Sequence, residues 1–292
     1  MKRIFIVNPT AGQGKALNIS KAIKSVCEQE GIDYIIHYTM AKGEATMLAK
    51  QYSNNIEPMI IYSVGGDGTL NEVVNGIALS KSILGIIPAG TGNDFVRSLD
   101  SKQNHIGKVD LGKVNDKYFI NIASLGIDAE IAANVDVIKK MKIPNSLVYY
   151  TSIFYTIAKY KNCNIFIDNQ VYSNCVTLLA ACNGSYYGGG IKIAPNANLN
   201  DGLMDVYLVD KLSKLQILYL FTKLLSGKHE QYSAIHKFST NNITIKSDDL
   251  LVCNIDGEII KDNSFNIHII KDGINILNND LPKIKNLTRT IK

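Results

Sequence analysis

Two short glycine-rich segments, each carrying an aspartate, have the residue types and spacing that suit phosphate binding. The first reads G-G-D-G-T at 65–69 and carries Asp67, and the second reads G-T-G-N-D at 90–94 and ends on Asp94. Glycine lets a backbone approach a ligand closely, and the N–H groups of such turns bind anionic oxygens. Because each segment lies between a short apolar run and a helix-like stretch, we expect one polyphosphate site.

Neither segment matches the dinucleotide fingerprint G-x-G-x-x-G, and two tight turns are the structural alternative. A third loop, N-P-T-A-G-Q-G-K at 8–15, resembles a P-loop only superficially, because its glycines are too close together and Ala16 replaces the hydroxyl residue. An ordinary strand–helix connection is the alternative there. Its expected place beside the two glycine-rich segments makes a phosphate or ribose contact plausible.

Further carboxylates have both a functional and a structural interpretation. Asp94 is either a metal-facing group or a helix N-cap, and Asp110 lies in an apolar strand, where a buried acid needs a metal–water network or a hydrogen-bond donor. Asp201, in N-D-G, marks either a hairpin turn or an oxygen-rich Mg²⁺ or Ca²⁺ site. Asp256 or Glu258, in D-G-E, could accept a proton as general base, and a plain turn is the alternative.

Residues 1–120 alternate strand patterns with helix patterns, which predicts an α/β domain with a parallel, Rossmann-like, nucleotide-binding sheet. Ligands on such sheets bind at the carboxyl ends of the strands. The loops 8–12, Thr39, 65–69 and 90–94 all fall at those expected ends. Four loops that meet at one edge support a binding site more strongly than any single loop.

Residues 121–277 contain many short strands separated by Asn-Gly and Asp-Gly turns, with a few helices between them. They predict a second domain, a largely antiparallel β-sandwich. The tail 278–292 is basic and is expected to return to the first domain. The segment 145–159 is predicted to be a helix with apolar side chains beyond one stripe and lysines at both ends. It is either a packed helix or a hydrophobic wall facing lipid.

The composition of the chain limits the classes of substrate and partner that we expect. The 292 residues carry a net charge of +5, which suits an anionic substrate or an anionic membrane surface. No Lys/Arg stripe with interleaved aromatics is present, so we expect no nucleic-acid partner. The five cysteines show no C-x-x-C spacing, and no apolar leader or run of about 18 apolar residues occurs. We therefore expect a cytoplasmic protein that visits the membrane peripherally if its substrate is a lipid.

Taken together, the motifs resemble the catalytic-domain family of diacylglycerol kinases, specifically the soluble bacterial lipid kinases. They run in family order over nearly the whole chain: N-P-x-x-G at 8–12, G-G-D-G-T-x-N-E at 65–72, P-x-G-T-G-N-D-F at 88–95, Y-G-G-G at 187–190, D-G-L-M-D at 201–205 and D-G-E at 256–258. Alone, G-G-D-G is shared with NAD kinases.

The resemblance implies ATP and Mg²⁺ as cofactors and an active site between the two domains. Implied ATP contacts are Asn8, Pro9, Thr10, Ala11, Gly12, Thr39, Gly66, Asp67, Gly68, Thr69, Leu70, Asn71, Glu72 and Thr91. Implied metal ligands are Asp201 and the backbone of Asn198 and Leu203 for a structural Mg²⁺, and Asp67, Asp94 and Asp110 for a catalytic Mg²⁺–water network. Glu258, assisted by Asp256, corresponds to the proton acceptor.

The hypothesis that follows is an ATP-dependent lipid kinase, most simply one that phosphorylates diacylglycerol to phosphatidic acid. Phosphatidylglycerol, a sphingoid base or a polyprenol stay open as substrates, because the lipid pocket has no short motif. Phosphorylation of a soluble molecule such as NAD, or a non-catalytic sensor of lipid or nucleotide, are the alternatives. The oligomeric state stays open between a monomer and a homodimer.

Overall fold

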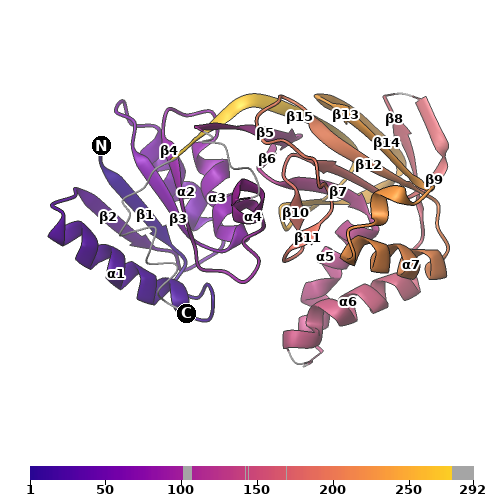
Figure 1. The fold of residues 1–292 in the computed structure, drawn as a ribbon, viewed down its shortest axis with the longest axis horizontal. Helices are drawn as coiled ribbons and strands as arrows, with labels where there is room; N and C mark the ends of the chain where they lie inside the picture. The colour runs from indigo at the N-terminus through magenta and orange to yellow at the C-terminus, as the bar shows by residue number, and fades with distance from the viewer. Residues whose placement is uncertain (101–106, 142, 144, 169, 278–292) are drawn as a thin grey trace.

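The computed structural model describes residues 1–100, 107–141, 143, 145–168 and 170–277 (Figure 1). The predicted return of the tail 278–292 therefore lies outside the described residues. The helices are α1 Lys15–Gln29, α2 Glu44–Ser53, α3 Asp67–Ile77, α4 Asp94–Asp100, α5 Ile127–Lys139, α6 Asn145–Lys159, α7 Lys214–Leu225 and the 3₁₀ turn His229–Gln231.

The strands of the first part are β1 Arg3–Val7, β2 Tyr34–Tyr38, β3 Ile60–Gly65 and β4 Ile83–Pro88. Those that follow are β5 Lys108–Val114, β6 Lys117–Phe119, β7 Ile122–Gly126, β8 Cys163–Ile167, β9 Gln170–Cys182, β10 Tyr186–Tyr187, β11 Ile191–Lys192, β12 Met204–Asp210, β13 Ile235–Thr240, β14 Asn242–Ile255 and β15 Glu258–Ile276. Both halves carry the element types that the sequence predicts.

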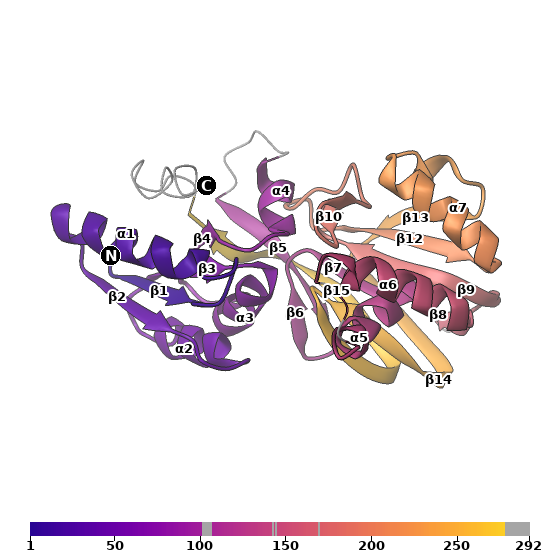
Figure 2. The ribbon, with the colours of Figure 1, turned by 90° about the horizontal axis from the view of Figure 1, so that it is seen from below.

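Strands β2, β1, β3 and β4 form the expected parallel sheet, in that spatial order. Alternate residues of β1 point to opposite faces, and both sets are buried. Ile4 and Ile6 pack in the cluster that includes α2 and α3, and Phe5 and Val7 pack in the cluster that includes α1. Figure 2 shows α1 on one side of the sheet and α2 and α3 on the other. This double cover explains the unbroken apolar run of β1.

The second part is built from antiparallel pairs in the order β13-β12-β9-β7-β14-β15. Strand β8 pairs with both β14 and β9, so the sheet folds over itself around a closed core. This agrees with the predicted sandwich-like domain. Residues 242–255 form the single strand β14, whose register with β15 shifts between Lys246 and Leu251.

Strand β15 joins the two parts of the molecule. It pairs with β14 at its start and with β5 further along, and its last residues, Asn275 and Ile276, pair in parallel with Ile83 and Leu84 of β4. Strands β5 and β6 precede residue 121 but are hydrogen-bonded to this β-rich part. The turn between β14 and β15 lies beside the loops at the carboxyl edge of the parallel sheet, because the turn and these loops line one cavity.

Candidate active site

The loops that leave the four parallel strands are tied to one another by backbone hydrogen bonds. Asn8 N–H donates to the carbonyl of Val64 at 3.0 Å, and Ala89 N–H donates to the carbonyl of Gly65 at 2.7 Å. Thr39 N–H donates to the end of β1 at 2.9 Å. The predicted convergence of these loops at one sheet edge is therefore present.

Asp67 and Asp94 form a carboxylate pair at this edge. The two oxygens of Asp67 accept the backbone N–H groups of Asn93 and Asp94, both at 2.7 Å, so Asp67 holds the second glycine-rich segment. Asp94 accepts N–H from Gly189 through Oδ2 at 2.9 Å. Its Oδ1 is buried with no hydrogen-bond partner among the described residues. Burial raises the pKa of Asp94, and the charge of Asp67 adds to this rise.

Different physical constraints require glycine at different positions of the two segments. A Cβ on Gly90 would lie 2.5 Å from the Cα of Gly66, and one on Gly92 would lie 2.6 Å from Oδ2 of Asp67. These two positions therefore need glycine because the protein packs against itself there. A Cβ on Gly68 would meet nothing within 4 Å. Gly68 is exposed, and it is the glycine in G-G-D-G that leaves room for a ligand.

The D-G-E turn begins with Asp256, whose carboxylate accepts hydrogen bonds from backbone N–H groups. Asp256 has a positive φ of 48° and accepts N–H from Ile120 and Ile122 at 2.7 Å and from Asn121 at 3.2 Å. These donors lie where β6 passes into β7. Burial raises the pKa of Asp256 to about 6, although the three N–H groups act in the opposite direction. Asp256 thus connects the D-G-E turn to the segment between β6 and β7, which lies beside the Asp67–Asp94 pair.

Glu258 is placed differently. Its Oε1 lies 3.0 Å from Nζ of Lys42, and its side chain is 28% exposed. Lys42 comes from the loop between β2 and α2, so this ion pair bridges the parallel sheet and the β-rich part. Among the described residues, Glu258 accepts none of the three backbone N–H groups that bind Asp256, and it lines a cavity.

Asp110 does not join Asp67 and Asp94. It is fully buried, and its oxygens accept N–H from Gly202 at 2.6 Å and from Asp272 at 2.9 Å. Burial raises the pKa of Asp110, and the nearby Asp201 and Asp272 add to this rise. Asp110 thus stabilises the Asp201 turn through hydrogen bonds to the backbone.

The predicted structural metal site lies at that turn. Asp201 accepts N–H from Leu203 through Oδ1 at 3.0 Å, and Gly202 between them has φ of +78°. Leu199, next to Asn198, accepts N–H from Asp110 at 2.7 Å. Within the described part of the chain, no group of three or more His, Cys, Asp or Glu side chains is arranged to hold a metal ion. The backbone bonds account for the turn, and the structural Mg²⁺ stays a prediction.

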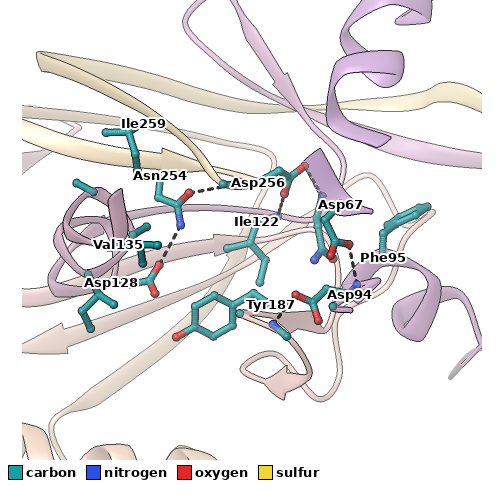
Figure 3. Close-up of a pocket in the computed structure, with 18 of the residues that line it drawn as sticks. Asp67, Asp94, Phe95, Ile122, Asp128, Val135, Tyr187, Asn254, Asp256 and Ile259 are labelled. Atoms are coloured by element: carbon teal, nitrogen blue, oxygen red, sulfur yellow. Dashed lines mark hydrogen bonds between the residues drawn. The ribbon is translucent and has the colours of Figure 1, made fainter. Parts of the chain in front are cut away.

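Two cavities meet at the sheet edge. The larger, about 890 Å³, is lined by Asp67 and Asp94 at one end and by α5 and β14 residues at the other (Figure 3). The smaller, about 500 Å³, is lined by the loops of the parallel sheet and by the D-G-E turn. Both cavities are lined by Lys42, Asp67, Asp256 and Gly257.

The predicted ATP contacts divide between these cavities. Those that line the smaller one are Asn8, Thr10, Thr39, Asp67, Gly68, Thr69 and Glu72. Thr91 and Leu70 line the larger one. Pro9, Ala11, Gly12, Gly66 and Asn71 line neither cavity. Of these, Gly12 would place a Cβ 2.0 Å from the carbonyl oxygen of Ala89, so its glycine is a packing requirement of the loop.

The lining residues that are absent from the sequence-based prediction include Lys42, Asp128 and Asn254. Asp128 lies in the first turn of α5, where an acid is common for electrostatic reasons alone. Asn254 is the polar residue in the apolar run 250–255, which was a local signal available in the sequence. Lys42 is one exposed lysine among many. Their convergence depends on contacts between distant segments.

Comparison with known proteins agrees with this architecture. The diacylglycerol kinase catalytic domain model matches residues 2–125, and the model of the YegS C-terminal NAD kinase beta sandwich-like domain matches residues 121–278. A protein named diacylglycerol kinase from Bacillus subtilis strain 168 is 32% identical over 276 residues, which is 88% of this chain and 90% of that protein. One of the same name from Staphylococcus saprophyticus is 30% identical, with 87% and 88% covered.

Solved structures give the same result. A structure from Bacillus anthracis strain Sterne aligns with a TM-score of 0.72 at 28% identity, over 95% of this chain and 97% of that one. In the described part of the chain, no helix is long and apolar enough to cross a bilayer. Because both family models and these relatives agree over most of its length, the chain belongs to the diacylglycerol kinase family of phosphotransferases.

Proposed function

We propose that this protein transfers the γ-phosphoryl group of ATP to the hydroxyl of a lipid, most simply diacylglycerol. The observation that supports it best is the pair of cavities that meet at Asp67 and Asp256. The smaller cavity is bordered by polar loops that suit a nucleotide. The larger cavity has an apolar wall of Ile131, Val135 and Ile259 that suits an acyl chain. A phosphoryl group at their junction can be attacked in line from the lipid side.

The chain's own groups would supply positioning and charge. The exposed N–H groups around Gly68, at the start of α3, bind phosphate oxygens with the positive end of the helix. Lys42 lines both cavities and places its ammonium beside the transferred group. Glu258, held by that lysine at 3.0 Å, receives the proton of the attacking hydroxyl. Asp256 fixes the turn that carries Glu258.

The carboxylates fit a kinase-type Mg²⁺ site. Mg²⁺ in such sites is held by one or two carboxylates together with waters and substrate phosphates, so a cluster of three acids is not required. Asp94 offers a buried oxygen with no partner among the described residues, and Asp67 lies beside it. When bound there, Mg²⁺ would neutralise charge on the phosphates. Asp94 must be ionised to hold the metal ion.

We expect the membrane to approach the face formed by α6 and α7. Phe154 on α6 is 63% exposed and Leu215 on α7 is 79% exposed. Lys159 and Lys223 lie on the same two helices. Sedimentation with vesicles that contain anionic lipid should show binding that weakens as salt rises, because the attraction is screened. Binding that does not respond to salt would instead indicate insertion of the apolar side chains.

The activity is tested with labelled ATP, Mg²⁺ and a total lipid extract, with the labelled product identified by mass spectrometry. A phosphorylated lipid supports the proposal, and its identity names the substrate. A parallel reaction with NAD and no lipid tests the soluble alternative. ATP binding without transfer to any lipid or to NAD would indicate a non-catalytic sensor and would refute the proposed function.

A further inference from the structure

The larger cavity contains an acid that the phosphoryl transfer does not use. Asp128 lies in the first turn of α5 and lines the cavity at the end away from Asp67 and Asp94, as Figure 3 shows. It is 8% exposed and lines the same cavity as the apolar wall of Ile131, Val135 and Ile259. A buried carboxylate at the wall of an apolar pocket is costly without partners, so its surroundings indicate what it is for.

Three side chains hold Asp128 with hydrogen bonds. Ser124 donates its hydroxyl to Oδ2, and Asn254 donates through Nδ2 to the same oxygen at 3.5 Å. The amide of Asn254 is oriented by Gly257, whose N–H donates to its Oδ1 at 2.9 Å. The hydroxyl of Tyr187 also bonds to Asp128. Four segments of the chain thus converge to fix one carboxylate.

These partners leave Asp128 with remaining capacity as a hydrogen-bond acceptor. A carboxylate can accept about four hydrogen bonds, and the described residues supply three. Asn254 can only donate from its Nδ2, so the arrangement suits an ionised acid. Burial raises the pKa of Asp128, and these hydrogen bonds oppose that rise. The remaining position is suited to a donor from a molecule in the cavity.

Tyr187 and Gly189 connect this acid to the reacting end of the cavity. Gly189 donates to Asp94, and Tyr187, two residues earlier, bonds to Asp128. Figure 3 shows Tyr187 between the two carboxylates, with Ile122 beside it. A headgroup whose reacting hydroxyl lies at the junction of the two cavities, beside Asp67, would therefore extend along Tyr187 toward Asp128.

We propose that Asp128 selects the lipid substrate by accepting a hydrogen bond from a second donor, a hydroxyl or an ammonium group, on the headgroup that carries the reacting hydroxyl. Diacylglycerol has a single hydroxyl, which is consumed by the reaction, and its ester oxygens cannot donate. A monoacylglycerol, a glycerol headgroup with two hydroxyls, or an amino alcohol with an acyl or alkyl chain each carries the second donor. The inference rests on the proposed lipid kinase function and narrows its substrate class.

The test compares two lipids that differ in the second donor. A diacylglycerol and the monoacylglycerol with the same acyl chain are assayed in mixed micelles with the wild-type protein, Asp128→Asn and Asp128→Leu. The ratio of kcat/KM for the two lipids is compared between variants, which cancels the contribution of the missing acyl chain. A sphingoid base in a third arm distinguishes an ammonium donor from a hydroxyl donor.

We expect Asp128→Leu to lower the monoacylglycerol-to-diacylglycerol ratio about 10- to 100-fold, the effect of one hydrogen bond to a charged group. Asp128→Asn, which keeps the shape of the side chain, should fall between. The KM for ATP should not change, because Asp128 does not line the smaller cavity. Asp116→Asn removes an exposed acid in the β5–β6 turn and should leave the ratio unchanged.

A ratio that is the same in all four proteins would overturn the inference. Reduced stability of the Asp128 variants with that unchanged ratio would make Asp128 a structural residue of α5. If no lipid is phosphorylated, the proposed function fails first. The affinities for the same two lipids are then measured without ATP by equilibrium dialysis, and their ratio is compared between variants. An equal loss of affinity for both lipids in Asp128→Leu would refute the role of Asp128 in substrate selection.

Discussion

Gly68 and Gly90 both belong to glycine-rich segments, but the structure predicts opposite consequences for substituting them with alanine. A Cβ on Gly90 would lie 2.5 Å from the backbone Cα of Gly66, which cannot rotate away. A Cβ on Gly68 meets nothing within 4 Å. Gly90→Ala therefore tests packing between the two segments, and Gly68→Ala tests the approach of a ligand.

The expected magnitudes follow from these contacts. Overpacking of a buried site typically costs about 1–3 kcal/mol, and Gly90→Ala is at the upper end because backbone meets backbone. Each kcal/mol lowers the melting temperature of a protein near this size by about 2–4 °C, so a fall of several degrees is expected. Gly68→Ala lies in the first turn of α3, where alanine gains up to about 1 kcal/mol over glycine. Its stability should be equal or slightly higher.

The assay combines unfolding with kinetics. The chain contains no tryptophan, so urea unfolding is followed by far-UV circular dichroism. For Gly68→Ala we expect the KM for ATP to rise about tenfold or more, because a clash of about 1.4 kcal/mol with a phosphate changes affinity tenfold. Unchanged ATP kinetics in Gly68→Ala would contradict the role of Gly68 in ligand approach. Unchanged stability in Gly90→Ala would contradict the role of Gly90 in packing.

Three further outcomes are expected. Glu258→Gln should lower kcat at least about 100-fold with little change in the KM for ATP, as loss of a general base does; equal loss of both would make Glu258 a binding residue. Mg²⁺ should raise the melting temperature of the wild-type protein with ATP present but not that of Asp94→Asn, as read by a thermal shift with and without chelator. The pKa of Asp256, about 6, exceeds its unfolded value of 3.8, so the folded state holds that proton more tightly. The free energy of unfolding should therefore fall by roughly 3 kcal/mol as pH rises from about 4 to about 6, and Asp256→Asn should remove that part of the pH dependence.

Much of the fold follows from local patterns. Strand β1 buries both of its faces, and a strand covered on both sides has an unbroken apolar sequence that is visible without coordinates. Helix α6 has the bounds, 145–159, that its sequence predicts. The lengths of β14 and β15 are hard to infer from sequence, because polar residues interrupt their apolar pattern where one face is exposed.

The site was predictable in part. Placing the glycine-rich loops at the carboxyl ends of parallel strands requires only the order of strands and helices, so the proximity of Asp67 and Asp94 could be inferred. The family resemblance grouped Asp110 with them in one metal network. Instead, the pairing of β5 with β15 directs Asp110 to the turn at Gly202.

Short stretches of sequence determine the order of strands, turns and helices. They also determine the phosphate-binding chemistry of the glycine-rich segments, because each of these features depends on neighbours along the chain. The distinction between Gly68 and Gly90, and between Asp256 as a backbone clamp and Glu258 as a group facing a cavity, depends on atoms more than a hundred residues away or in another loop. So does the convergence of Asn254 and Tyr187 on Asp128. Such contacts between distant segments arise only in the folded chain, and no local pattern encodes them.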